Sequence, residues 1–324
     1  MTTGTRDGTS TQGTSTQGTT TMHAAQVPLA QADARRLIGR ALEQAGRPPA
    51  AEVLALPGAG TTSYVLRVGT DLVARFPMTG EDPDAVRAAL VAEHAAMAEF
   101  AAACPVPAPL PVAIGEGDAG FPLPFSLQTW VEGEVATPTS VAGSVPVAEQ
   151  LADLLGTLRE VPTRGRRFAG GGRGGELPDH DAWMRTCLEN SRGLLPVEEL
   201  AALWERWRTL PHESADVMSH RDLIPGNLLM GGGRLVGVLD AGGFGPADPA
   251  LDLVAAWHLL DGPAREALRE RLDVPELDWL RGAAWAFAQA MGLVWYYRET
   301  NPPMAELGRT TLGRLLASAE ELVR

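Results

Sequence analysis

The spacing of apolar residues changes along the chain. In the first part, short apolar runs separated by turn residues predict strands over 52–56, 64–68, 72–76 and 125–131. In the second part, apolar residues recur at intervals of three and four, which is the spacing of helices with one buried face. This spacing predicts helices over 145–160, 180–195, 197–210, 250–260, 263–272, 277–297 and 304–323. The chain is therefore expected to be α+β, with its strands first and most of its helices last.

Two more helices, over 30–45 and 84–103, are predicted around the first three strands, and the proline-rich stretch 105–111 leads into another strand. Residues 1–22 consist almost entirely of Thr, Ser, Gly and Gln, with GTSTQ twice in tandem. Such a segment cannot bury a core, so we expect a disordered tail. Met22 is a candidate alternative start.

The stretch 217–248, VMSHRDLIPGNLLMGGGRLVGVLDAGGFGPAD, carries the candidate chemistry. Its two short apolar runs, separated by three glycines, predict a hairpin. Asp222 and Asn227 come before this hairpin, and Asp240 ends it. The segment therefore places two carboxylates and one carboxamide on loops that a pair of strands would hold in position.

These three side chains suit phosphoryl transfer, which needs a positioned base and bound charge rather than covalent work from the protein. Asp222 is the candidate base for an incoming hydroxyl. Asn227 and Asp240 offer the hard oxygen ligands that Mg²⁺ takes together with nucleotide phosphates. The order His-Arg-Asp, an Asn five residues later and Asp-x-Gly after a hairpin matches the catalytic loop of kinases. An ordinary turn with a capping Asp is the alternative interpretation.

This stretch resembles the aminoglycoside phosphotransferase and choline kinase branch of the protein-kinase-like fold, and within it an actinobacterial-type antibiotic phosphotransferase. The branch typically has H-x-D-x-x-x-x-N followed by D-x-G or D-x-D. The matching residues are His220, Asp222, Asn227, Asp240 and Gly242. Ala241 replaces the phenylalanine of the protein-kinase motif, as is common in this branch. The resemblance extends from about residue 54 to about residue 300, although only this stretch is highly specific.

The resemblance implies a bilobal protein-kinase-like fold. Behind the tail of residues 1–22, residues 23–130 would form a nucleotide-binding N-lobe with a small antiparallel sheet and one main helix. Residues 131–324 would form a larger, mostly helical C-lobe that carries the catalytic hairpin and the acceptor site.

The same resemblance implies nucleotide-binding roles in the N-lobe. Arg75 stands where kinases place the cation for the α and β phosphates, and a guanidinium can hold phosphate oxygens in pairs. Glu93 stands where the family pairs a helix glutamate with that cation. Both residues could instead be ordinary surface charges.

Two further segments would contact the nucleotide. Thr61, Thr62 and Ser63 end a turn that could cover phosphates with backbone N–H groups, although a plain hairpin turn fits equally well. Backbone groups near Gln128, Thr129 and Trp130 would bind the base, and the Trp130 ring is expected to pack rather than to stack on the base.

Outside these segments, several features have mainly structural interpretations. Asp248-Pro249 is a strong helix start signal. Asp252 would either hold the catalytic loop, as the resemblance implies, or complement the helix dipole. The glycine and arginine loop 164–175 is expected to be a mobile linker, because it lacks the context of a phosphate-binding loop. Three tryptophans are expected in the core, namely Trp183, Trp204 and Trp207.

Composition narrows the possible partners. The 324-residue chain has a net charge of −13, which argues against nucleic acid and is compatible with a cationic acceptor or simply with solubility. No apolar run is long enough to span a membrane. Cys104 and Cys187 have no disulfide or metal spacing, so we expect buried thiols and a cytoplasmic protein.

The resulting expectation is a Mg²⁺-dependent enzyme that moves the γ-phosphate of ATP or GTP to a hydroxyl of a small molecule. The resemblance favours an aminoglycoside- or macrolide-type antibiotic. Acidic residues of the helical lobe could meet an amine on the acceptor; the candidates are Asp179, Asp181, Asp261 and Glu299. A metabolite kinase for choline, an amino alcohol or a sugar is the first alternative, and a nucleotide-binding pseudokinase the second. A regulated protein kinase is not supported, because too few residues follow Gly242 for an activation segment. The oligomeric state stays open.

Overall fold

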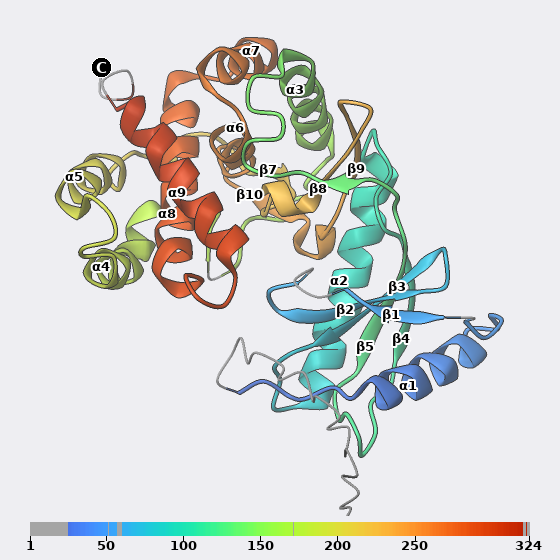
Figure 1. Cartoon of the computed structure of the whole chain (residues 1–324). Helices are drawn as coiled ribbons and strands as arrows, with labels where there is room; N and C mark the ends of the chain where they lie inside the picture. The colour runs from blue at the N-terminus through green and yellow to red at the C-terminus, as the bar shows by residue number, and fades with distance from the viewer. Residues whose placement is uncertain (1–24, 51, 57–59, 171, 320–321, 323–324) are drawn as a thin grey trace, which may run out of the picture.

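The computed structural model describes residues 25–50, 52–56, 60–170, 172–319 and 322. The predicted tail over 1–22, and part of the first turn, lie outside these residues. The described chain forms two lobes, with the sheet in one and most helices in the other (Figure 1). This arrangement confirms the α+β class and the bilobal expectation.

The N-lobe contains one five-stranded antiparallel sheet in the order β1-β2-β3-β5-β4. Its strands are β1 (Val53–Ala55), β2 (Ser63–Val68), β3 (Leu72–Pro77), β4 (Pro111–Gly115) and β5 (Phe125–Thr129). Helix α1 (Gln31–Gln44) packs its apolar face on the sheet, with Leu37 and Ile38 almost fully buried. Phe76 and Phe125 stack beneath it with ring centroids 4.1 Å apart. The alternating strands therefore bury one common apolar layer.

Helix α2 (Pro83–Ala103) connects the two lobes. It begins with Asp82, whose side chain accepts a hydrogen bond from the N–H of Asp84, and with proline at its first position. Its last turns reach the C-lobe core, where Phe100 is completely buried. The Phe100 ring meets His220 edge-to-face at 5.3 Å and Phe244 at 5.2 Å. The helix that lies against the N-lobe sheet thus ends beside the catalytic loop.

The C-lobe is built on the buried helix α8 (Glu276–Tyr296), whose Trp285, Phe287 and Met291 have no exposed surface. The surrounding helices are α3 (Val145–Glu160), α4 (Asp181–Asn190), α5 (Val197–Trp207), α6 (Val254–Leu259), α7 (Gly262–Leu272) and α9 (Pro302–Ala317). Helices α8 and α9 lie side by side in the centre of this lobe (Figure 1). These bounds agree with the predicted helices to within a few residues, except at α6 and at the ends of α4 and α9.

Strands of the C-lobe frame the catalytic segment. β8 (Leu228–Gly231) and β9 (Arg234–Val238) form the predicted antiparallel hairpin, and Gly232 and Gly233 at its tip have positive φ angles of 58° and 75°. β6 (Glu134–Val135) pairs with the open edge of β8. β7 (Val217–Ser219) pairs with β10 (Gly245–Ala247), which the apolar pattern does not predict. The loops before and after the hairpin are therefore tied to paired strands.

Two expectations need correction. The segment after Asp248 begins with a 3-10 turn over Leu251–Leu253, and the α-helix starts only at Val254. Trp204 and Trp207 are in the core, but Trp183 is 42% exposed, so its prediction as a core residue is wrong. Among the described residues, no helix is both long and apolar enough to cross a membrane.

Candidate active site

The catalytic loop is organised by the buried ring of His220. This side chain has no exposed surface, and its Nε2 lies 2.8 Å from the carbonyl oxygen of Leu239, next to Asp240. Across the same junction, the N–H of Leu239 donates to the carbonyl of Asn227 at 2.8 Å. Two hydrogen bonds therefore join the loop that carries Asp222 to the strand end that carries Asp240.

Asp252 holds the backbone of this loop. Its carboxylate accepts hydrogen bonds from the N–H groups of His220 at 2.7 Å and Arg221 at 2.9 Å, and only 5% of it is exposed. Arg221 has a φ of 71°, a left-handed conformation that costs energy for a non-glycine residue. The two hydrogen bonds stabilise that conformation, which confirms the loop-holding role of Asp252.

Both carboxylate oxygens of Asp222 have partners. Oδ1 accepts from Gln289 Nε2 at 2.8 Å and from Arg173 Nη2 at 3.1 Å. Oδ2 has one partner, Asn227 Nδ2, at 3.2 Å. Since a carboxylate oxygen can accept two hydrogen bonds, Oδ2 retains a free lone pair. The side chain is still 38% exposed, so a hydroxyl can reach it.

Asn227 is oriented by these contacts. Its Nδ2 also donates to the main-chain carbonyl of Asp222 at 2.8 Å. Because both donor contacts use the nitrogen, the Oδ1 atom of the same amide faces away from Asp222 and is available as a ligand.

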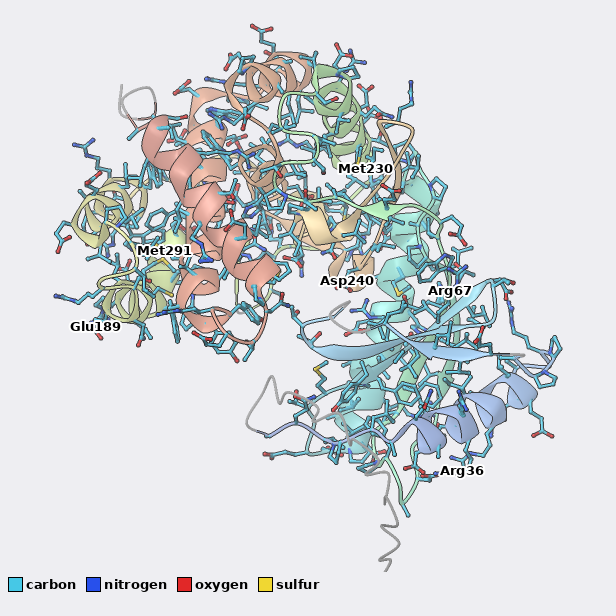
Figure 2. The ribbon with its side chains drawn as sticks, viewed as in Figure 1. Arg36, Arg67, Glu189, Met230, Asp240 and Met291 are labelled. Atoms are coloured by element: carbon cyan, nitrogen blue, oxygen red, sulfur yellow. The ribbon has the colours of Figure 1, made fainter. Side chains whose placement is uncertain are left out.

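Asp240 and Arg75 bring the two lobes together at the site. Asp240 follows β9 with a φ of 61°, again left-handed for a non-glycine residue. Arg75 Nη1 donates to its Oδ1 at 2.5 Å and Nη2 to its Oδ2 at 3.2 Å. Figure 2 shows Asp240 at the junction of the lobes. Burial alone would raise the pKa of Asp240, but the Arg75 charge and hydrogen bond, with His220, lower it.

Glu93 lies near this pair on α2 without forming a direct ion pair with Arg75. Its pKa is raised, because burial and the negative charge of Asp240 together outweigh the attraction of Arg75. The expected helix glutamate therefore stands within reach of the cation, while Asp240 is the carboxylate that Arg75 contacts.

A cleft of about 380 Å³ opens beneath β2 and β3. Its walls include Thr62 from the first turn, Ser63 at the start of β2 and Gln128 from β5. The three charged residues Arg75, Glu93 and Asp240 also line it. Gly242 also lines it, and a Cβ atom there would lie 3.2 Å from the Glu93 side chain. Asp222 and Asn227 are not among the residues that line this cleft.

The other predicted nucleotide contacts do not line this cleft. The N–H of Thr129 donates to Leu110 at 2.9 Å, and that of Trp130 donates to Asp71 at 2.8 Å. These two backbone donors are thus already used, and their role toward a base stays a prediction. Thr61 hydrogen-bonds the Tyr297 side chain across the lobes.

Arg173 is a site residue that the sequence did not reveal. It comes from the end of the loop 164–175. There the carbonyl of Gly174 accepts from Asp248 N at 3.0 Å, and that of Gly175 accepts from Arg281 Nη2 at 3.1 Å. Gly174 has a φ of 117°, which only glycine adopts readily. This end of the loop is thus hydrogen-bonded to the C-lobe, and the mobility expected for the loop stays a prediction.

A second missed group is the sealed ion pair of Asp248 and Arg281, with exposures of 0% and 1%. Asp248 also accepts from Trp285 Nε1 at 2.7 Å and from the N–H of Ala250 at 2.9 Å. The sequence did offer one sign of these contacts, namely polar residues within apolar helical patterns, such as Arg281 and Gln289 in α8. A polar side chain that is buried needs a hydrogen-bond or charge partner.

The donor set fits Mg²⁺. Asn227 and Asp240 would supply oxygens, and among the described residues there is no cluster of three or more His, Cys, Asp or Glu that would form an all-protein metal cage. Mg²⁺ bound to nucleotides commonly uses one or two protein oxygens, with phosphates and water completing the octahedron.

The comparisons with known proteins agree with this geometry. Residues 53–289 match the model of the phosphotransferase enzyme family. A search of curated proteins found no match. The GDP complex of wild-type aminoglycoside 2'-phosphotransferase-IIIa is 18% identical, with a TM-score of 0.62 over 89% of this chain and 100% of that one.

Two more solved structures share the fold. The GDP and kanamycin complex of APH(2")-IIia is 19% identical, with a TM-score of 0.63 over 87% of this chain and 97% of that chain. The macrolide 2'-phosphotransferase MphH from Brachybacterium faecium is 16% identical, with a TM-score of 0.54 over 83% and 96%. Since the family model covers well over half of the sequence, this chain belongs to the phosphotransferase enzyme family and is a small-molecule O-phosphotransferase.

Proposed function

We propose that the chain transfers the γ-phosphate of ATP or GTP, with Mg²⁺, to a hydroxyl of a small antibiotic-like acceptor. Asp222 acts as the base, Asn227 and Asp240 hold the metal, and Arg75 steadies the phosphates. The supporting observation is that one loop and the following strand end are hydrogen-bonded together beside a cleft lined by Arg75.

The contacts of Asp222 suggest how the step proceeds. Its Oδ1 is occupied by Gln289 and Arg173, so Oδ2 is the oxygen that accepts the proton of the acceptor hydroxyl. The hydroxyl oxygen forms a bond to the γ-phosphorus as the bond to the bridging oxygen breaks, and ADP or GDP leaves. Mg²⁺ would neutralise charge on the phosphate oxygens. Arg173 keeps a cation beside the base.

Arg75 would exchange partners during nucleotide binding. In the structure its guanidinium is bonded to Asp240, and both side chains face the cleft with exposures of 22% and 42%. Phosphate oxygens offer the same paired geometry to a guanidinium as a carboxylate does. Asp240 can share its oxygens between Arg75 and a metal ion, because each oxygen accepts more than one contact.

The acceptor is best matched by a molecule with large apolar faces. Of the four acids considered for a cationic acceptor, Asp181 is paired with Arg208, Asp261 with Arg314 and Glu299 with Arg298. Asp179 forms no ion pair with the other described residues and remains the one candidate for an amine. In contrast, a row of aromatic rings runs from beside Asp222 to α4. It consists of Tyr297, Tyr296, Trp295 and Trp183, with centroids 4.9, 5.7 and 6.0 Å apart in that order. Aromatic faces of this kind suit a macrolide-type acceptor better than a polycation.

The test is a transfer assay with γ-labelled ATP and GTP against a macrolide, an aminoglycoside, choline, an amino alcohol and a sugar. We expect labelled macrolide to dominate and to require Mg²⁺. Asp222→Ala should lower turnover by roughly 10²–10⁴-fold, the usual contribution of a positioned base. Nucleotide binding without transfer to any acceptor would instead favour a pseudokinase, and wild-type turnover in Asp222→Ala would refute the assignment of the base.

A further inference from the structure

A chain of buried hydrogen bonds leads from Asp222 away from the cleft and into the helical core. Gln289 on α8 donates its Nε2 to Asp222 Oδ1 at 2.8 Å. Its Oε1 lies 3.1 Å from Nε2 of His258 on α6. The other ring nitrogen, Nδ1, lies 2.7 Å from Oγ1 of Thr311 on α9. His258 and Thr311 have no exposed surface, so water cannot replace either of these two partners.

The direction of every hydrogen bond in this chain follows from its first member. An ionised Asp222 can only accept, so the Gln289 atom facing it must be the NH₂ group. Oε1 then faces His258, which must carry its proton on Nε2. A neutral imidazole has one donor and one acceptor, so Nδ1 accepts and the Thr311 hydroxyl donates. One arrangement of hydrogens satisfies all four groups.

We propose that Gln289 is a positioning residue for Asp222, and that His258 and Thr311 act through it by fixing the orientation of its amide. This proposal rests on the proposed function, in which Asp222 is the base that these residues orient. A flipped Gln289 would point Oε1 at a carboxylate and repel it. Without His258, nothing on α6 would distinguish the two orientations.

The electrostatic surroundings support a neutral ring. Burial and, to a smaller extent, the charges of Arg173 and Arg314 lower the pKa of His258 to about 4, against the hydrogen bond to Gln289, which raises it. The ring thus keeps one donor and one acceptor at neutral pH. A charged ring would have two donors, and Nδ1 could no longer accept from Thr311.

The kinetic test is a double-mutant cycle with Gln289→Leu and His258→Phe. Gln289→Leu should lower kcat about tenfold or more with the nucleotide KM unchanged, because a hydrogen bond to a charged group is lost. His258→Phe should lower kcat in the wild-type background and have no further effect in Gln289→Leu, since residues of one network are coupled. The proposal would be overturned if the fold-losses in kcat of the two single variants multiplied in the double variant.

Thr311 provides a matched pair of variants that should both fold. Thr311→Ser keeps the hydroxyl and should retain wild-type kcat, whereas Thr311→Val has the same shape without the donor and should lower kcat about two- to threefold. Equal kcat values for the two variants at equal thermal stability would contradict a role for Thr311.

The tautomer of His258 in the full chain is a readout that does not depend on activity. It is measured by long-range ¹H–¹⁵N correlation spectra, in which the His258 signals are assigned by their loss in His258→Phe. We expect the neutral Nε2–H form between about pH 5 and 9, and a mixture of tautomers in Gln289→Leu. An Nδ1–H form in the wild type would overturn the proposal. If the wild type phosphorylates no acceptor, the proposed function fails, while the tautomer still decides the hydrogen-bond chain.

Discussion

Two arginine–aspartate pairs flank the η3 turn, Ala241–Gly243, in very different environments. Arg75 and Asp240 meet in the cleft between the lobes, and their side chains are 22% and 42% exposed. Arg281 and Asp248 are sealed in the C-lobe, with exposures of 1% and 0%. The sealed aspartate has further partners in Trp285 and a backbone N–H, whereas Asp240 relies on Arg75. The Arg75–Asp240 pair, which would exchange partners when nucleotide binds, is accessible to solvent. The Arg281–Asp248 pair, which stabilises the C-lobe, is not.

Breaking the sealed pair should have the largest effect. Arg281→Leu leaves the Asp248 carboxylate buried without its cation, and we expect a loss of about 3–5 kcal/mol of unfolding free energy. Urea unfolding measures this loss. The matched control is Arg271→Leu, which breaks an exposed pair with Asp153 and should cost under about 1 kcal/mol. Equal losses in the two variants would contradict the comparison.

Changing Asp240, the acid of the pair in the cleft, should weaken Mg²⁺ binding rather than the stability of the fold. Asp240→Asn keeps the shape but loses the charge, so the Mg²⁺ concentration for half-maximal transfer should rise about tenfold or more. The midpoint of urea unfolding should change little, because the side chain is 42% exposed. A large loss of stability with an unchanged Mg²⁺ requirement would mean that Asp240 serves the fold.

Changing the cation of the cleft pair should affect the nucleotide. Arg75→Met removes a guanidinium that would bind phosphate oxygens, so the nucleotide KM should rise about tenfold or more. Arg36→Met, on α1 and outside the cleft, is the control and should leave KM unchanged. The role assigned to Arg75 would be refuted by a wild-type KM in steady-state assays of Arg75→Met.

The smallest effect should come from Glu93. Its folded-state pKa is raised above 4.5, so its charge destabilises the fold above the folded pKa, and this cost disappears as the pH falls below 4.5. Glu93→Gln should therefore raise Tm slightly near pH 7 and leave it unchanged near pH 4. The exposed Glu43→Gln on α1 is the control. A lower Tm at pH 7 would contradict the assigned sign.

Sequence reasoning performed best where the signal was local. The hairpin of β8 and β9, the antiparallel strands β2 and β3 and the long helices followed from apolar spacing and turn residues. The residues of the catalytic loop followed from motif spacing. β10 did not, because Gly245-Pro246-Ala247 has no strand preference of its own and becomes a strand only by pairing with β7.

Contacts between distant parts of the chain could not be read in this way. Arg173 and Gln289 meet Asp222 from 49 and 67 residues away, and no local pattern indicates such a meeting. Trp183 was expected in the core, yet it is 42% exposed although its ring lies 6.0 Å from that of Trp295 on α8. A single polar residue in an apolar helix was the most useful sign available. It predicts that the side chain has a buried hydrogen-bond or charge partner, but it does not identify that partner.

The position of Phe100 has a consequence for how the molecule unfolds. Helix α2 is anchored at one end under the N-lobe sheet and at the other end beside His220, so we expect that neither lobe unfolds without the other. Heating should therefore give one calorimetric transition, and cutting the backbone between the halves should yield fragments that fold only when mixed.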